Sequence, residues 1–141
     1  MSDKKEIAGV IFSLPKDLAN RIFNNHKSVF VKFLTHPTKN TRIKENMKLI
    51  IYVSNLNKSV IGEAIIKKVE FLKYNELIKE HKKEIFLSTR ELKDYASKRE
   101  EKPLLVLILN EIKKYNKEKR LNYPITMSGR YITKEEYNKI K

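Results

Sequence analysis

Residues 128–131 combine a hydroxyl, a planar cation and an aromatic ring in one short stretch. Ser128, Arg130 and Tyr131 flank Gly129, whose conformational freedom suits a turn. Such groups can hold an unstacked nucleobase, because an aromatic face stacks on the base and a guanidinium adds a cation–π contact. The structural alternative is that Tyr131 packs the C-terminal segment onto the core while Arg130 is solvated. We take Ser128, Arg130 and Tyr131 as candidate nucleic-acid contacts.

A second group of chemically informative residues is a run of cations between positions 113 and 120. Its members are Lys113, Lys114, Lys117, Lys119 and Arg120. Cations at this density can neutralise several phosphates of a nucleic-acid backbone. The alternative is a solvated face without a ligand, which is how most charge runs are used.

The remaining reactive residue types do not form a recognisable metal or catalytic pattern. His26, His36 and His81 fall in different predicted elements and lack carboxylate or thiolate neighbours at ligand spacing. The chain has no cysteine, and its three glycines form no phosphate-binding loop. No Ser-His-Asp arrangement can be proposed either. We therefore expect no metal and no cofactor.

The charge balance points to a polyanionic partner. The chain carries 31 Lys+Arg against 17 Asp+Glu, a net charge of +14. Residues 15–46 and 103–141 each contribute +5, whereas residues 73–102 are nearly balanced, with nine basic and seven acidic groups. A positive electrostatic field of this size attracts nucleic acid. Binding releases counterions from the phosphates, so the affinity depends on salt. The alternative is a lysine-rich composition inherited from an AT-rich genome or from thermophily.

Length and composition predict one globular domain spanning residues 1–141. Hydrophobic residues make up 40% and charged residues 34% of the 141, which is enough to build a core. The lack of cysteine suits a reducing, cytoplasmic location. No run of 18 apolar residues occurs, so we expect no membrane span. The oligomeric state stays open.

Hydrophobic periodicity predicts strands and helices that would position these candidate residues. Gly62 lies inside a long strand and predicts a bulge or bend there. Capping boxes at Ser88 with Glu91, and at Thr133 with Glu136, mark two helix starts. We expect strands at 7–14, 29–34, 48–54, 59–72 and 104–115, and helices at 15–25, 74–84, 88–101 and from 133. The pattern predicts an α+β fold: a small, mostly antiparallel β-barrel with an early helix and a helical insertion.

The order of these segments resembles the PUA-like superfamily, in particular its ASCH branch and a related archaeal family. The resemblance covers residues 7–72 by motif and the remainder by layout. ASCH domains typically carry a G-x-K-x-x-E-x-R motif after the first helix, lining a cleft between that helix and the barrel. In this chain Lys27 matches the motif lysine and Lys32 replaces the arginine, whereas Asn25 and Phe30 replace the glycine and the acid.

The resemblance implies an RNA-binding module, with RNA preferred over DNA. The ligand would lie in the cleft between the first helix and the barrel. Arg21 would border this cleft unless it pairs with Asp17, one turn away on the same helix. The candidate contact residues are Lys27, Lys32, Arg21, Ser28, Ser128, Arg130 and Tyr131.

A small hydrolase acting on a modified nucleoside is the alternative that the resemblance raises. Some ASCH proteins resemble acetylcytidine amidohydrolases, which use a lysine, a threonine and a glutamate. Lys27 and Glu63 would then act as acid and base. The threonine would align at Phe30, which has no hydroxyl to act as nucleophile. This departure favours binding over catalysis, while a protein-interaction domain of a larger assembly stays possible on charge alone.

Overall fold

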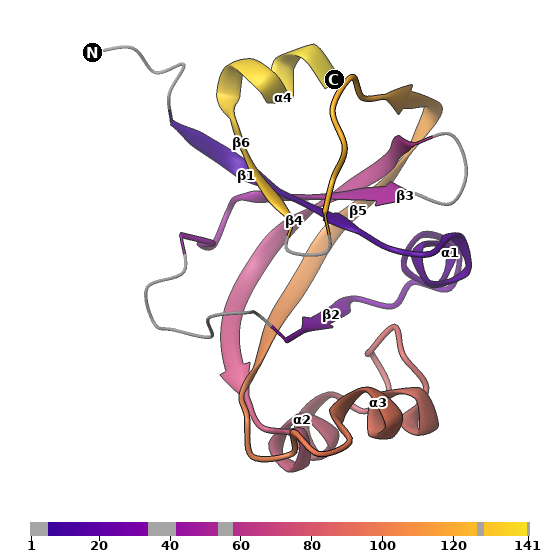
Figure 1. Cartoon of the computed structure of the whole chain (residues 1–141), viewed down its shortest axis with the longest axis vertical. Helices are drawn as coiled ribbons and strands as arrows, with labels where there is room; N and C mark the ends of the chain where they lie inside the picture. Colours follow the sequence, from indigo (N-terminus) through magenta and orange to yellow (C-terminus); the bar gives the residue numbers. More distant parts are fainter. Residues whose placement is uncertain (1–5, 34–41, 54–57, 127–128, 141) are drawn as a thin grey trace.

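The computed structural model describes residues 6–33, 42–53, 58–126 and 129–140. These residues form a mixed α+β fold with six strands and four helices (Figure 1). The elements are, in chain order, β1 (Ile7–Ser13), α1 (Lys16–Asn24), β2 (Val29–Lys32), β3 (Lys48–Val53), β4 (Ser59–Leu72), α2 (Tyr74–His81), α3 (Thr89–Ala96), β5 (Leu104–Arg120), β6 (Arg130–Thr133) and α4 (Lys134–Ile140). No helix among the described residues is both long enough and apolar enough to cross a membrane.

The strands form one open sheet in the order β2-β5-β4-β3-β1-β6. Antiparallel pairing dominates, as predicted, and the parallel pair is β1 with β3. The expected closure into a barrel is wrong. The edge strands β2 and β6 are four residues each and form ladders with β5 and β1, and β2 adds one isolated bridge between Val29 and Ile85. Such short edges leave the sheet open, and helices cover its faces instead.

Two apolar clusters are built on this sheet. The larger contains residues of α1, α2 and α3, among them Ile22, Leu77 and Leu92. The smaller gathers Ile11, Ile132 and other residues beneath α4. Along β1 the side chains alternate between the two clusters, as a strand covered on both faces requires. In Figure 1, α2 and α3 lie at one end of the molecule and α4 at the other.

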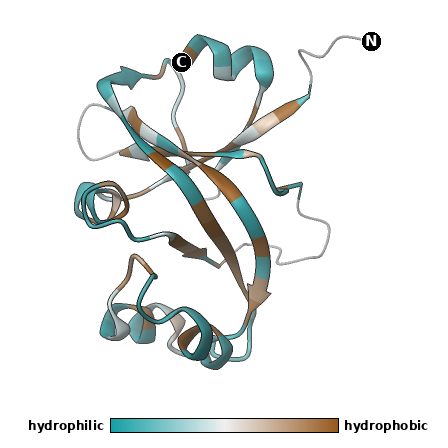
Figure 2. Ribbon diagram, turned by 180° about the vertical axis from the view of Figure 1, so that it is seen from behind, coloured by the Kyte–Doolittle hydropathy of each residue, from teal (hydrophilic) through white to brown (hydrophobic). Residues whose placement is uncertain are grey.

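The long strands β4 and β5 change character along their length. The run 104–107 is fully buried, as its continuous apolar sequence predicts, whereas the end of β5 is exposed. Figure 2 shows this change along β5, which is coloured hydrophobic at its buried start and hydrophilic at its exposed end. The expected irregularity at Gly62 is confirmed by a register shift there. A Cβ at Gly62 would lie 2.4 Å from the Phe23 ring, so the missing side chain lets α1 pack directly on the sheet.

The predicted capping boxes are formed. The Ser88 hydroxyl accepts from the Glu91 amide at 3.1 Å and the Glu91 carboxylate accepts from the Ser88 amide at 2.8 Å. Thr133 and Glu136 make the same reciprocal pair at the start of α4. The strand β6 was not predicted, because its residues were assigned to a ligand-contacting turn. Its four residues are too few for alternation to be distinguished from a loop.

Candidate nucleic-acid interface

The ring of Phe12 is the point where two of the predicted contact segments meet. Phe12 lies on β1 with 2% of its surface exposed. The Lys32 ammonium, from the end of β2, lies 5.4 Å from the centroid of the ring. Gly129, just before β6, lies against the same ring, since a Cβ there would come within 2.5 Å of it. Gly129 has φ +81°, a conformation that glycine adopts without strain.

Tyr131 belongs to the same surface. It pairs with Val10 across the β1–β6 ladder, so both side chains face the side of the sheet that carries Phe12. Its hydroxyl accepts a hydrogen bond of 3.1 Å from the Arg42 amide, and the Arg42 guanidinium lies 5.6 Å from its ring centroid. The ring also packs partly on the larger core, as the structural alternative expected. We call Phe12, Lys32, Arg42, Gly129 and Tyr131 the Phe12 site.

Lys32 is the lysine of the Phe12 site, and its electrostatic state is unusual. Its side chain is half-buried, and this desolvation lowers the pKa of its ammonium. Among the described residues no carboxylate pairs with it, and its one contact of ionic character is the Phe12 ring. A desolvated cation without a counter-charge costs stability, and groups of this kind concentrate at functional sites.

Lys27 and Arg21 lie elsewhere, beside a hollow of about 480 Å³ between α1 and the segment joining α2 to α3. The Lys27 ammonium donates a 2.9 Å hydrogen bond to the Lys83 carbonyl. Arg21 binds both oxygens of Glu91 and donates to the Phe86 carbonyl at 3.2 Å. The Arg21 guanidinium and the Ser88 amide lower the pKa of Glu91 to about 2.

The structural alternative for Arg21 named Asp17 as its partner, but the ion pair forms with Glu91. Glu91, fixed by its capping box, presents both carboxylate oxygens to the guanidinium, and a bidentate pair is stronger than a single contact within one helix. Arg21 thereby ties α1 to α3. Ser28 also has a structural connection, because its carbonyl accepts a 2.8 Å hydrogen bond from the Leu109 amide. Lys27 and Arg21 thus line a hollow that does not include Phe12, and Ser28 is not among its lining residues.

Arg130 lies on the opposite face of the sheet from Tyr131, because neighbouring residues of a strand alternate. Its guanidinium stacks 4.2 Å from the Tyr123 ring centroid and binds Glu136 at 2.8 Å. Arg130 and Tyr131 therefore do not contact one base together on the same face of the sheet. Ser128, the remaining predicted contact, lies outside the described residues.

Comparison with known proteins identifies the family. Residues 7–134 match the family described as "Domain of unknown function (DUF365)". The chain belongs to this family. The uncharacterized protein MJECS03 of Methanocaldococcus jannaschii is 33% identical over 104 residues, covering 67% of this chain and 96% of that protein. The expected relation to an archaeal family is confirmed.

Solved structures with the same architecture confirm the ASCH-like fold. ASCH from Zymomonas mobilis superposes with a TM-score of 0.79 at 22% identity, over 94% of this chain and 93% of that chain. The N-terminal domain of Staphylothermus marinus McrB gives a TM-score of 0.62 at 19% identity, over 96% of each chain. At these identities the likeness establishes the fold.

In this DUF365 chain, Glu63 is the centre of a buried polar network beneath α4. Its carboxylate accepts hydrogen bonds from the hydroxyls of Tyr115 and Tyr137, both at 2.8 Å, and pairs with the Lys48 ammonium at 3.2 Å. Burial raises the pKa of Glu63, but the tyrosine and lysine contacts outweigh it and the net pKa is lowered. Burial and the adjacent carboxylate raise the pKa of both tyrosines.

This network separates the two residues that the hydrolase alternative needed. Gly62 faces Phe23 of α1, so Glu63, the next residue, faces away from α1 and toward Tyr137 of α4. The Lys27 ammonium is bound to the Lys83 carbonyl instead. The structure thus does not bring Lys27 and Glu63 together as an acid and base pair.

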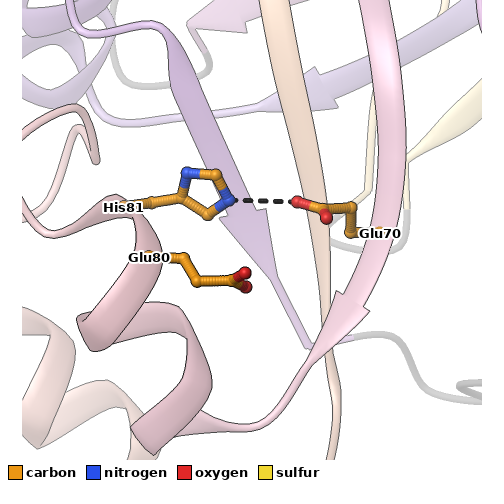
Figure 3. A group of neighbouring side chains, drawn as sticks. All are labelled: Glu70, Glu80 and His81. Carbon is orange, nitrogen blue, oxygen red and sulfur yellow. Dashed lines mark hydrogen bonds and ion pairs between the residues drawn. The ribbon is translucent and has the colours of Figure 1, made fainter.

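One group of side chains has the composition of a metal site. Ligand atoms of Glu70, Glu80 and His81 lie within 4.8 Å of one another, where α2 passes β4 (Figure 3). His81 Nε2 is 3.0 Å from Glu70, whose second oxygen pairs with the Lys68 ammonium at 3.3 Å. This proximity was not predicted, because Glu70 lies 11 residues from His81 in a different element. The hydrogen bond and ion pair already account for the position of Glu70, and the hydrogen bond with His81 ties α2 to the sheet.

Proposed function

We propose that this protein binds nucleic acid, RNA in preference to DNA, and that the Phe12 site contacts the ligand. The observation that carries the proposal is the state of Lys32. Its ammonium is desolvated by the protein, lies on an aromatic ring and has no carboxylate partner among the described residues. A phosphate group or the acceptor edge of a base would provide the missing counterpart.

The surroundings of Lys32 support a nucleic-acid ligand over a small anion. Arg42, on the same face, carries an exposed cation, and the partly exposed Tyr131 ring lies beside it. Cations interleaved with an aromatic ring suit an unstacked strand, in which phosphates and bases are both accessible. The net charge of +14 also attracts the negatively charged nucleic acid over a longer range. The preference for RNA rests on the resemblance to PUA-like domains.

The test is a binding titration of a short single-stranded RNA, and of DNA of the same sequence, by fluorescence anisotropy. Lys32→Met keeps the apolar stem and removes the charge. We expect it to weaken RNA binding by about ten-fold, the value of one charge-assisted contact. The matched control is Lys93→Met, which changes an exposed lysine of α3 in the charge-balanced segment.

Equal losses in the two variants would contradict the proposal, because diffuse charge alone would then explain the binding. Equal affinity for RNA and DNA in the unaltered protein would remove the stated preference.

A further inference from the structure

The exposed end of β5 and the helix α4 border a surface that the Phe12 site does not include. Two adjoining hollows of about 400 Å³ each lie there, and both are lined by Arg120 and Tyr123. Lys119 and Lys139 complete the hollow toward α4, and Lys58 completes the other. We call these residues, together with Glu136, the β5–α4 groove. The two hollows share Arg120, Leu121, Asn122 and Tyr123, so they adjoin.

The charge of this groove is uncompensated. Its lining contains four cations, Lys58, Lys119, Arg120 and Lys139, and one anion, Glu136. Arg130 neutralises that anion by binding it at 2.8 Å. Among the described residues no carboxylate pairs with any of the four cations. The groove therefore keeps its positive charge and can exchange solvent counterions for phosphates.

The arrangement of the cations favours an extended polyanion over a compact one. They come from three separate parts of the chain: the residue before β4, the end of β5, and α4. They are also exposed, so they surround the groove instead of converging on one buried point. Tyr123 lines both hollows and is held by the guanidinium of Arg130, 4.2 Å from its ring centroid. A backbone that follows a row of cations past an aromatic ring is how single strands are bound without sequence readout.

We propose that the β5–α4 groove binds the phosphate backbone of the RNA, independently of its sequence, on the opposite face of the sheet from the Phe12 site. This inference rests on the proposed function, which it extends from one site to two. The division of roles has a measurable consequence. Groove cations control how affinity depends on salt, whereas Lys32 contributes one contact.

The experiment compares the salt dependence of RNA binding in three proteins. The groove variant carries Lys119→Gln, Arg120→Gln and Lys139→Gln. The control variant carries Lys79→Gln, Arg90→Gln and Lys93→Gln, which removes the same residue types from exposed positions in the balanced segment. Each phosphate contact with a single strand contributes about 0.7 to the slope of log K against log salt. We expect the groove variant to lose about 2 from that slope and the control to lose less than about 0.7.

Thermal unfolding of each variant shows that the protein is folded, and Arg120→Gln and Lys139→Gln as single changes repeat the measurement with smaller perturbations. Each single change should lower the slope by about 0.7. Equal slopes in the groove and control variants would overturn the groove. A reduced slope in the groove variant, with Lys32→Met indistinguishable from Lys93→Met, would uphold the groove and reject the Phe12 site. Absence of RNA binding in the unaltered protein would overturn both proposals.

Discussion

Replacing Lys32 by methionine should raise stability while lowering RNA affinity. Methionine preserves most of the buried stem and removes an ammonium that burial disfavours. The loss of the contact with the Phe12 ring costs about 0.5–1 kcal/mol, which offsets part of the gain. We expect a net increase of about 0.5–1 kcal/mol in the free energy of unfolding, or about 2–4 °C in Tm.

The pH dependence of this difference provides a second measurement. The ordinary pKa of lysine is about 10.4, and that of Lys32 is lowered in the folded protein. Between the two values the unfolded chain holds a proton that the folded chain has released, so the stability of the unaltered protein rises with pH there. The advantage of Lys32→Met should therefore be full at neutral pH and shrink as the pH approaches about 10.4.

Urea unfolding followed by circular dichroism measures stability, and anisotropy measures affinity on the same preparations. The opposite signs of the two changes distinguish a desolvated cation from a structural lysine. A structural lysine would lose stability and binding together when replaced. Destabilisation by Lys32→Met would contradict the proposed role of Lys32 as a desolvated cation that binds the ligand. A stability advantage that does not change with pH would contradict it as well.

Three further predictions concern side-chain contacts that hold the helices in place. Glu63→Ala should lower the free energy of unfolding by about 2–4 kcal/mol, since it leaves two tyrosine hydroxyls and a lysine without their acceptor; a loss below about 1 kcal/mol in urea titrations would contradict this. The Glu91 pair with Arg21 should stabilise the protein above the ordinary glutamate pKa of about 4.3 and weaken as the pH falls toward 2. Arg21→Gln should therefore flatten the acid limb of a Tm against pH curve. Zn²⁺ should leave Tm unchanged, because Lys68 and the existing hydrogen bond occupy Glu70; a rise that His81→Ala abolishes would refute it.

Local signals located most of the elements. Strands with continuous or alternating apolar residues and helices with reciprocal caps were predicted close to their observed bounds, because these features depend on neighbours in sequence. The capping pair at Ser88 and Glu91 is an example. The same glutamate also binds Arg21 from 70 residues away, and that second role has no local signal. Glu70 with His81 is a similar case, since their contact depends on where α2 packs.

The errors in the sheet have a related origin. Closure of a barrel depends on which edge strands meet, and β2 and β6 are too short for their pattern to indicate a partner. The composition of the segment at Gly129 suggested a ligand-contacting turn, whereas it leads into a strand. Periodicity could have separated Arg130 from Tyr131 once that strand was recognised, because neighbouring side chains alternate. Arg42 had no comparable signal, since it lies outside any regular element and meets Tyr131 only in the folded chain.

The position of β6 explains how two sites of one ligand could lie on opposite faces of a sheet. As an edge strand, β6 directs Tyr131 toward the Phe12 ring and Arg130 toward the β5–α4 groove. No described strand covers its outer edge, so a single strand of RNA can pass round it from one face to the other. Binding at both faces at once makes the second contact intramolecular, which raises affinity without a new interface. The positive charge near the C-terminus would then position the backbone, and selectivity would depend on the Phe12 site.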